Sequence, residues 1–196
     1  MFTGIVESGE VVDLKKLSEG LELVISTPWN NSVLKTGESI SVNGTCLSLT
    51  KKSGQKLSFF VSPETIQKTN ISSLKKGQAI NIEHPLTPGS YLGGHFVQGH
   101  VDTVSAVKKV TKNKDVWIVE ISLPKQFKQY VVYKGSIAVN GVSLTINKVN
   151  SKSFELCIIP ITLKKSNFSY VTKNSMVNLE FDILAKYTER LLKKKK

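Results

Sequence analysis

The stretch Gly93-Gly-His-Phe-Val-Gln-Gly-His-Val-Asp102, at the middle of the chain, echoes the opening Phe2-Thr-Gly-Ile-Val-Glu7. In both, a glycine is followed two residues later by valine and then by an acidic residue. Further on, Ser39-Ile-Ser-Val-Asn-Gly-Thr-Cys-Leu-Ser48 returns as Ser136-Ile-Ala-Val-Asn-Gly-Val-Ser-Leu-Thr145, 97 positions later (140 − 43, from the two asparagines). A fixed period near half the chain length indicates an internal duplication.

Each repeat has the pattern of short strands separated by turn signals. Residues 21–26 and 116–122 are rich in β-branched and aromatic residues, and Asn43-Gly44 and Asn140-Gly141 each predict a tight turn or strand bend. Gly9 suggests a bulge or bend. Closure removes exposed sheet edges, so we predict an all-β fold of two tandem six-stranded antiparallel Greek-key barrels.

The end of the chain differs from both repeats. Apolar residues after Asp182 recur at helical spacing, Asp182 is a plausible N-cap, and the lysines 193–196 suit the C-terminal end of a helix dipole. The apolar stripe needs a cover, either an oligomer interface or the helix's own barrel. We therefore divide the chain into an N-terminal barrel (1–96), a C-terminal barrel (97–182) and an oligomerisation helix with a basic tail (183–196).

Composition limits the function classes. The chain is 40% hydrophobic, has no apolar run of the roughly 20 residues that span a bilayer, and begins without a signal pattern. The two cysteines lie in different repeats without a CxxC pair, which favours a reducing cytoplasm. The net charge of +12 could attract nucleic acid, but four of the charges are the terminal lysines and no RNP motif or zinc finger accompanies them. We expect neither a nucleic-acid nor a membrane partner.

The pattern Asn-Gly-x-[Cys/Ser]-Leu-[Ser/Thr] occurs once in each repeat. Residues i and i+2 of a strand face the same side, so each barrel presents two small polar side chains together. These are Cys46 and Ser48 in the first repeat, and Ser143 and Thr145 in the second. A wet strand face would explain one copy, but the recurrence favours paired sites that bind similar ligands.

Two histidines lie in the junction stretch. Their H-x4-H spacing is weak as a metal motif and has no supporting Cys or acidic partner, so we expect no metal. His100 is the better acid–base candidate, because an imidazole titrates near neutral pH. His95 could equally be a hinge residue bonded to the backbone, and Cys157 is expected to pack as a small hydrophobe.

The opening heptapeptide, the junction stretch and both Asn-Gly motifs resemble the riboflavin synthase family, over residues 1–192. The resemblance implies a transferase of the last step of riboflavin biosynthesis. It converts two molecules of 6,7-dimethyl-8-ribityllumazine into riboflavin and 5-amino-6-ribitylaminouracil by transfer of a four-carbon unit, without cofactor or metal. It also implies homotrimers formed through the C-terminal helix, with active sites between the N-terminal barrel of one subunit and the C-terminal barrel of the next. Association with lumazine synthase stays open.

Matched motif by motif, the resemblance implies two substrate pockets and a catalytic set. The first pocket would contain Gly4, Ile5, Val6, Cys46, Leu47, Ser48, Phe60, Val61, Ser62, Pro63, Glu64 and Thr65. The second would contain Gly99, His100, Val101, Lys134, Ser143, Leu144, Thr145, Cys157, Ile158, Ile159, Pro160, Ile161 and Thr162. The catalytic positions would be Phe2, Cys46, His100, Ser143, Thr145 and Asp182.

The reaction suggests roles for some of these residues, and one departs from the family. His100 or a bound water could take the proton from the C7 methyl group of one substrate, while Cys46, Ser48, Ser143 or Thr145 could deliver or hold the nucleophile at C7 of the other. The family usually has Pro-Glu-Thr in both repeats, whereas the second repeat here has Ile161 in the middle position. The sequence leaves open which barrel holds the donor. A non-catalytic lumazine or flavin carrier and a basic nucleic-acid-binding barrel are the rival interpretations.

Overall fold

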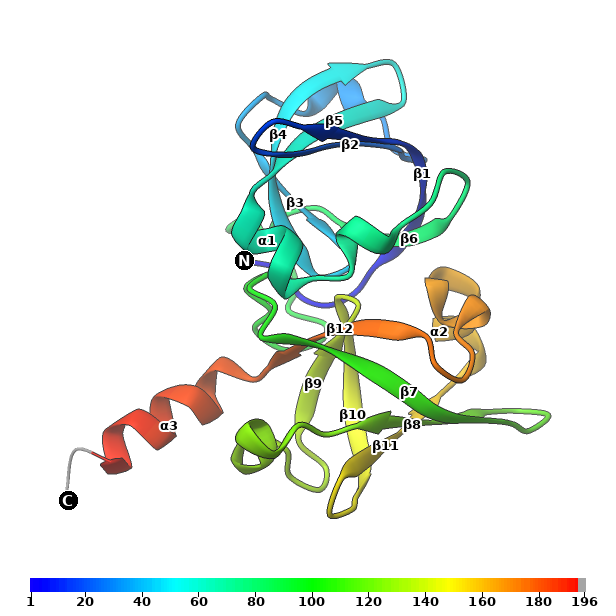
Figure 1. The fold of residues 1–196 in the computed structure, drawn as a ribbon, viewed down its shortest axis with the longest axis vertical. Coiled ribbons are helices and arrows are strands. Elements are labelled where there is room, and N and C mark those ends of the chain that lie inside the picture. The colour runs from blue at the N-terminus through cyan, green and yellow to red at the C-terminus, as the bar shows by residue number, and fades with distance from the viewer. Residues whose placement is uncertain (194–196) are drawn as a thin grey trace.

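The chain forms two closed antiparallel barrels of six strands each, one from each repeat, as the sequence predicted (Figure 1). The computed structural model describes residues 1–193, so Lys194 to Lys196 of the predicted tail lie outside the described residues. Within residues 1–193, no helix combines the length and the apolar character needed to cross a membrane.

The two barrels have the same topology. The first contains β1 (Glu7–Leu17), β2 (Gly20–Ser26), β3 (Ser39–Val42), β4 (Thr45–Ser53), β5 (Lys56–Val61) and β6 (Ala79–Glu83), in the closed order β1-β2-β5-β4-β3-β6. The second contains β7 (Thr103–Lys112), β8 (Trp117–Ser122), β9 (Ser136–Val139), β10 (Val142–Val149), β11 (Ser153–Ile158) and β12 (Met176–Phe181), in the order β10-β11-β8-β7-β12-β9. The helices are η1 (Asn31–Val33), α1 (Pro63–Lys68), η2 (Ile71–Ser73), η3 (Lys125–Tyr130), α2 (Pro160–Lys165), η4 (Asn167–Tyr170) and α3 (Ile183–Lys193). Each first-repeat strand therefore has a counterpart six numbers later.

Each Asn-Gly dipeptide is the two-residue turn of a β-hairpin, which joins β3 to β4 and β9 to β10. The φ angles are 45° and 76° at Asn43 and Gly44, and 45° and 78° at Asn140 and Gly141. Positive φ at both central residues defines the type I′ turn, whose twist matches that of the flanking strands.

The bulge expected at Gly9 is instead located between Val11 and Asp13, where the register of β1 against β2 shifts. Gly9 itself pairs regularly with Ile80 of β6. A Cβ atom at Gly9 would lie 3.0 Å from the carbonyl oxygen of Ser26. Glycine therefore permits a close approach of neighbouring strands here and does not form a bulge.

Each barrel encloses its own apolar core. In β11, Phe154, Leu156 and Ile158 are fully buried, while the alternate residues Glu155 and Cys157 face outward and are half-buried. Burial of one such side chain contributes about 1.5–3 kcal/mol. The period-two pattern of the sequence thus selects the inner face of each strand.

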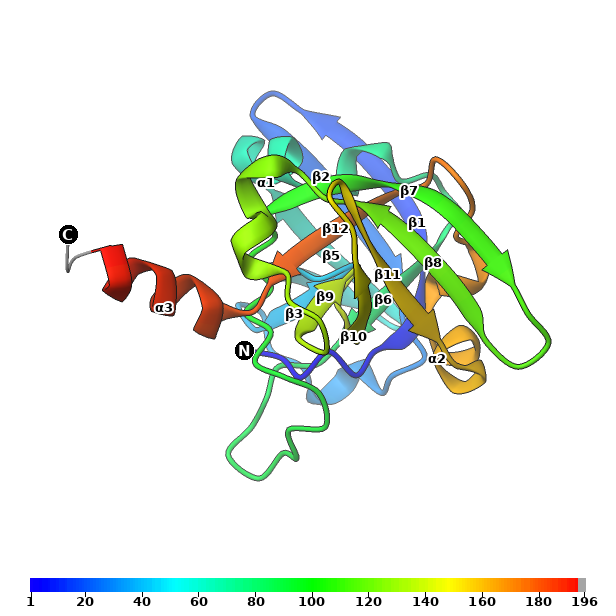
Figure 2. The ribbon, with the colours of Figure 1, turned by 90° about the horizontal axis from the view of Figure 1, so that it is seen from below.

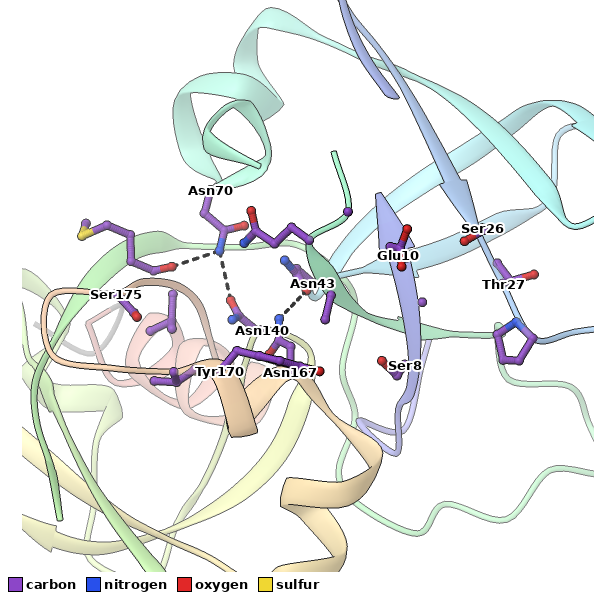
Figure 3. A pocket seen from close by; sticks show the side chains of 18 of the residues that line it. Ser8, Glu10, Ser26, Thr27, Asn43, Asn70, Asn140, Asn167, Tyr170 and Ser175 are labelled. Atoms are coloured by element: carbon purple, nitrogen blue, oxygen red, sulfur yellow. Dashed lines mark hydrogen bonds between the residues drawn. The ribbon is translucent and has the colours of Figure 1, made fainter. Parts of the chain in front are cut away.

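The barrels meet through buried asparagines in equivalent positions of the two repeats. The Nδ2 atom of Asn81 donates to the carbonyl oxygen of Asn140 at 2.9 Å, and that of Asn178 donates to the carbonyl oxygen of Asn43 at 2.8 Å. A second pair of hydrogen bonds is also equivalent in the two repeats. The side-chain nitrogen of Asn70 donates to the side-chain oxygen of Asn140 at 3.2 Å, and that of Asn167 donates to the side-chain oxygen of Asn43 at 3.1 Å (Figure 3). The contact between the barrels is therefore polar and directional.

The two Asn-Gly turns lie back to back at this interface. A Cβ atom at Gly44 would lie 2.6 Å from the nitrogen of Gly141, and one at Gly141 would lie 2.7 Å from the nitrogen of Gly44. Glycine at these positions allows the backbones of the two barrels to touch.

Helix α3 projects away from the second barrel (Figures 1 and 2). It contacts the barrel through η3, where the hydroxyl group of Tyr130 donates to Glu189, and through an ion pair between Lys186 and Asp102 at 2.7 Å. The stripe predicted from helical spacing is exposed, with Leu184, Tyr187 and Leu191 each at least 60% accessible. Packing of the stripe onto the helix's own barrel, one of the two expectations, is therefore not what the structure contains.

We expect Gly44→Ala to destabilise the protein more than Gly77→Ala does. Both glycines have nearly the same φ, 76° and 79°, but nothing lies within 4 Å of a Cβ atom at Gly77. The matched control thus isolates the contact between barrels from the backbone strain, which alone costs about 1 kcal/mol. Denaturant unfolding measures the difference, and equal losses of unfolding free energy in the two variants would contradict this account of the interface.

Candidate active site

The two matched segments at the start and middle of the chain cross between the barrels. Phe2 and Val97 form an isolated antiparallel bridge, with N–O distances of 2.7 and 3.1 Å. Phe2, a predicted catalytic residue, is fully buried at this bridge, against Ala138 and the half-buried Cys46.

Beyond the bridge, each segment docks on the barrel of the other repeat. The backbone nitrogen of Ser143 in β10 donates to the oxygen of Gly4 at 2.9 Å, and that of Cys46 in β4 donates to the oxygen of Gly99 at 2.8 Å. Val6 packs in the core of the second barrel. The grouping expected from the sequence, Gly4 with Cys46 and Gly99 with Ser143, is therefore reversed, because chain order does not reveal which barrel a crossing segment reaches.

We call residues 46–48, 60–65 and 99–101 the Cys46 site. Half-buried Cys46 and exposed Ser48 alternate with buried Leu47, as strand geometry predicts. Antiparallel pairing of β5 with β4 brings the α1 end of β5 beside this strand. The side chain of His100 is exposed, which leaves its imidazole available to a ligand.

The start of α1 supplies the polar groups of this site. Ser62 caps the helix, since its hydroxyl oxygen accepts from the nitrogen of Thr65 at 3.2 Å. Glu64 is exposed in the first turn, after Pro63. In the preceding strand, Phe60 faces outward and Val61 inward. Phe60 and Pro63 also line a groove of about 900 Å³ against the β1–β2 turn.

We call residues 4–6, 134, 143–145 and 157–162 the Ser143 site. Half-buried Ser143 and exposed Thr145 flank buried Leu144, and Ile5 lies exposed on the crossing segment. Cys157 is half-buried on the outer face of β11, so it does not pack in the core. Lys134 is exposed in a turn with φ 64°.

The helix at this second site lacks the polar features of the first. Ile159 occupies the N-cap of α2 without a side-chain hydrogen bond, where Ser62 caps α1. Ile158 is buried, whereas Ile159, Pro160 and Ile161 are exposed and Thr162 is half-buried. The Ser143 site therefore has an apolar rim where the Cys46 site has a carboxylate.

His95 belongs to the Ser143 site, which the sequence analysis did not predict. Its Nδ1 atom lies 2.7 Å from the Oγ atom of Ser143, and its backbone nitrogen donates to the oxygen of Thr3 at 3.2 Å. Gly94 permits this crossing, since a Cβ there would lie 2.7 Å from that of Ser143. Burial lowers the pKa of the His95 imidazole from 6.5, and the Asp182 carboxylate opposes this shift. The signal available in the sequence was a histidine that directly follows two glycines, Gly93 and Gly94.

Asp182 stands between β12 and α3. Its Oδ1 atom accepts from the nitrogen of Leu184 at 2.9 Å, which is the helix-capping arrangement that the sequence suggested. Within residues 1–193, no group of three or more His, Cys, Asp or Glu side chains is placed to hold a metal ion.

The cleft of about 600 Å³ between the barrels is a separate feature. Polar side chains line it, among them Ser8, Glu10, Asn70 and Asn140 (Figure 3). It contains none of the predicted site residues. The polar strand residues of the two candidate sites lie instead on the outward faces of β4 and β10.

Known proteins share both the duplication and the fold. The family described as "Lumazine binding domain" matches residues 3–85 and 98–182. The chain is 38% identical to the riboflavin synthase of Photobacterium leiognathi, over 98% of this chain and 89% of that one. It is 37% identical to the riboflavin synthase of Schizosaccharomyces pombe, over 98% and 94%. The chain belongs to the riboflavin synthase family.

Solved structures with lumazine and flavin ligands have the same fold. LumP complexed with riboflavin superposes with a TM-score of 0.86 at 26% identity, covering 92% of this chain and 99% of that one. LumP complexed with 6,7-dimethyl-8-(1'-D-ribityl) lumazine superposes with a TM-score of 0.84 at 24% identity, with the same coverage. The two matches of the family model, residues 3–85 and 98–182, correspond to the two barrels.

We expect the His95 imidazole to titrate below pH 6.5 in the wild type and in Ser143→Ala. Burial is the main cause of the lowered pKa, and it persists when the hydroxyl group is removed. Because the folded state binds this proton less tightly than the unfolded chain, His95 contributes stability above pH 6.5 that is lost as the pH falls. NMR titration of the histidine ring protons measures the midpoint. A wild-type value at or above 6.5 would contradict the placement of the ring.

Proposed function

We propose that this chain is a riboflavin synthase that transfers a four-carbon unit between two molecules of 6,7-dimethyl-8-ribityllumazine. The products are riboflavin and 5-amino-6-ribitylaminouracil. Curated relatives with this activity in their names are 34–38% identical over nearly the whole chain, which supports the assignment.

One observation carries the proposal: the chain presents two related faces built from equivalent residues. A dismutation consumes two copies of one substrate, so two similar binding faces match its stoichiometry. The Cys46 and Ser143 sites have the same backbone scaffold, including the crossed glycine whose carbonyl group accepts from the strand. A single-substrate reaction would not require such a pair.

The faces also suggest how subunits assemble. Ile5, Phe60, Ile159 and Ile161 are each 48–55% exposed on or beside the two sites. Exposed apolar groups of this size indicate a surface that another molecule covers. We place the Cys46 site of one subunit against the Ser143 site of a neighbour in a homotrimer, with the apolar stripe of α3 in the subunit interface.

The chemistry needs a proton acceptor and aligned rings. The exposed imidazole of His100, or a water that it holds, would take the proton from the C7 methyl group of one lumazine. Cys46 or Ser48 at one site, and Ser143 or Thr145 at the other, would hold the nucleophile at C7 of the second lumazine. Correct orientation of two bound rings alone can supply several kcal/mol of the barrier reduction.

His95 adds a positioned group to the Ser143 site. Because burial lowers its pKa, the imidazole is neutral at physiological pH. Its Nδ1 atom can then either accept a hydrogen bond from the Ser143 hydroxyl group or donate one to it, depending on the tautomer. That bond would restrict the hydroxyl to one orientation toward the substrate. The Cys46 site has no equivalent pair, so the two sites would treat identical substrates differently.

Two further aspects follow from the sequence pattern. Both cysteines are free thiols in separate barrels, which fits action in the cytoplasm. A lumazine synthase assembly would be a natural neighbour, because it would supply the substrate.

A lumazine or flavin carrier without catalysis is the second candidate. The likeness to LumP complexed with riboflavin favours it. Mixing the purified protein with ribityllumazine and following riboflavin fluorescence distinguishes the carrier from the enzyme. A carrier would bind the substrate without converting it, so no riboflavin fluorescence would appear.

We expect Cys46→Ser and His100→Gln each to lower turnover, His100→Gln by roughly 10²-fold, as for loss of a general base. His84→Gln is the control, because this histidine stacks on Trp29 outside both sites. Riboflavin formation is followed by fluorescence. Full activity in both site variants, with wild-type substrate saturation, would reject these roles.

Asp182→Asn tests whether Asp182 does more than cap α3. Asparagine keeps the capping ability, so the helix should remain, and its content is checked by circular dichroism. We expect turnover to fall by roughly tenfold, because the family resemblance implies a catalytic carboxylate at this position and asparagine carries no charge. Normal turnover would leave Asp182 as a helix cap alone.

The assembly is tested by native mass measurement. We expect 64.8 kDa, three times the 21.6 kDa of one chain. Leu184→Glu should shift the mass toward 21.6 kDa, because a buried charge in the stripe is costly, whereas Lys193→Glu on the opposite side of the helix should not. A wild-type mass of one chain would overturn the trimer.

A further inference from the structure

Two buried carboxylates occupy equivalent places at the ends of the last strands of the barrels. Glu83 ends β6 and Glu180 lies near the end of β12, 97 positions later (180 − 83). Their side chains are buried, with exposures of 8% and 4%. Neither touches the groups assigned to the chemistry, so the mechanism leaves both unexplained.

Each carboxylate accepts hydrogen bonds from two consecutive backbone N–H groups of a crossing segment. The nitrogens of Thr3 and Gly4 donate to Glu83 at 2.6 and 2.9 Å. Those of Gln98 and Gly99 donate to Glu180 at the same two distances, 2.6 and 2.9 Å. Hydrogen bonds to an ionised acceptor are among the strong ones, and two of them to adjacent donors fix both position and orientation.

The gripped residues are those that complete the candidate sites. Gly4 then accepts from Ser143, and Gly99 accepts from Cys46. A carboxylate on the first barrel thus holds the segment at the Ser143 site, and a carboxylate on the second barrel holds the segment at the Cys46 site. Each carboxylate therefore acts on the site that lies on the opposite barrel.

Stability alone is a poor reason for this arrangement. Burial raises the pKa of both carboxyl groups, although the backbone N–H donors pull in the opposite direction. A buried charge that remains costly after pairing contributes little net stability. Its benefit would be the fixed geometry of the segment that it holds.

We propose that Glu83 and Glu180 are positioning residues, each of which sets the substrate site on the opposite barrel. Glu83 sets the Ser143 site and Glu180 sets the Cys46 site. The identity of the ligand rests on the proposed function, whereas the hydrogen bonds from each crossing segment to its glutamate do not. Glu83 accepts one hydrogen bond more than Glu180 does from its segment, because the hydroxyl group of Thr3 also donates to it at 2.6 Å.

The first experiment reads the two sites separately with riboflavin as the probe. In Cys157→Ser, alkylation of the remaining thiol reports on the Cys46 site. In Cys46→Ser, Cys157→Ser and Ser143→Cys combined, the new thiol reports on the Ser143 site. The first repeat carries cysteine at the equivalent place, so the barrel accommodates it. Riboflavin should protect both thiols.

Glutamine keeps the shape of glutamate but turns one acceptor into a donor that faces a backbone N–H. Glu180→Gln should raise the riboflavin concentration for half-protection at the Cys46 site by roughly tenfold or more, the effect of losing a charged hydrogen bond. At the Ser143 site, the riboflavin concentration for half-protection should change by less than about twofold in Glu180→Gln. Glu83→Gln should give the reverse pattern. Each variant is thus the control for the other.

The second experiment needs no ligand. In protein labelled with nitrogen-15 glycine, the amide proton resonance of Gly4 should move upfield in Glu83→Gln while that of Gly99 stays, and Glu180→Gln should do the opposite. If Glu83→Gln does not fold, Thr3→Val removes one donor from the same grip and should weaken the Ser143 site alone.

The outcomes distinguish the positioning role of the two glutamates from the proposed function. Equal loss of both sites in both variants, or unchanged Gly4 and Gly99 amide resonances, would overturn the positioning role. Failure of riboflavin to protect both reporter thiols in proteins that keep Glu83 and Glu180 would reject the proposed function. The amide comparison would still decide whether the two carboxylates hold the crossing segments.

Discussion

Everything in this molecule depends on the close approach of two glycine backbones at the axis between the barrels. Gly44 and Gly141 touch there because neither has a side chain, and asparagine amides on both sides donate to the carbonyl oxygens of Asn43 and Asn140 beside the contact. An apolar interface would tolerate sliding, whereas paired amide hydrogen bonds tolerate little displacement. The interface therefore sets one relative orientation of the barrels. That orientation brings each crossing segment onto the opposite barrel.

The sequence predicted the fold because the evidence for it is local and repeated. Asn-Gly between alternating strands has few structural solutions, and its recurrence at a constant offset required the same solution twice. The helix after Asp182 was equally local, since helical spacing and a capping residue are read within a few residues. Gly9 was the exception. A strand glycine can mark a bulge or a close approach, and only the neighbouring strand distinguishes them.

The candidate site was predictable in its residues more than in its connections. Alternation in β4 and β10 placed the polar pairs on one face, with leucine inside, as the structure has them. The exchange of Gly4 and Gly99 between barrels was beyond pattern analysis, because it is decided by how two finished barrels dock. The contact of His95 with Ser143 joins residues 48 positions apart. No periodicity carries information over that separation, although the adjacent glycines marked a tight passage.

Under the proposed function, duplication also raises a chemical question, because two identical substrates must act in opposite ways on two similar faces. The scaffold of the two sites is matched in strand, turn and crossed segment, so it cannot distinguish them. The distinction must come from the few unmatched side chains. His100 stands where the first copy has Ile5, and Ile161 stands where the first copy has Glu64. The Cys46 site thus gathers an imidazole and a carboxylate, while the Ser143 site has an apolar rim and a hydroxyl group bonded to buried His95. A shared scaffold with unequal side chains can hold two identical molecules alike and still make one of them the more reactive.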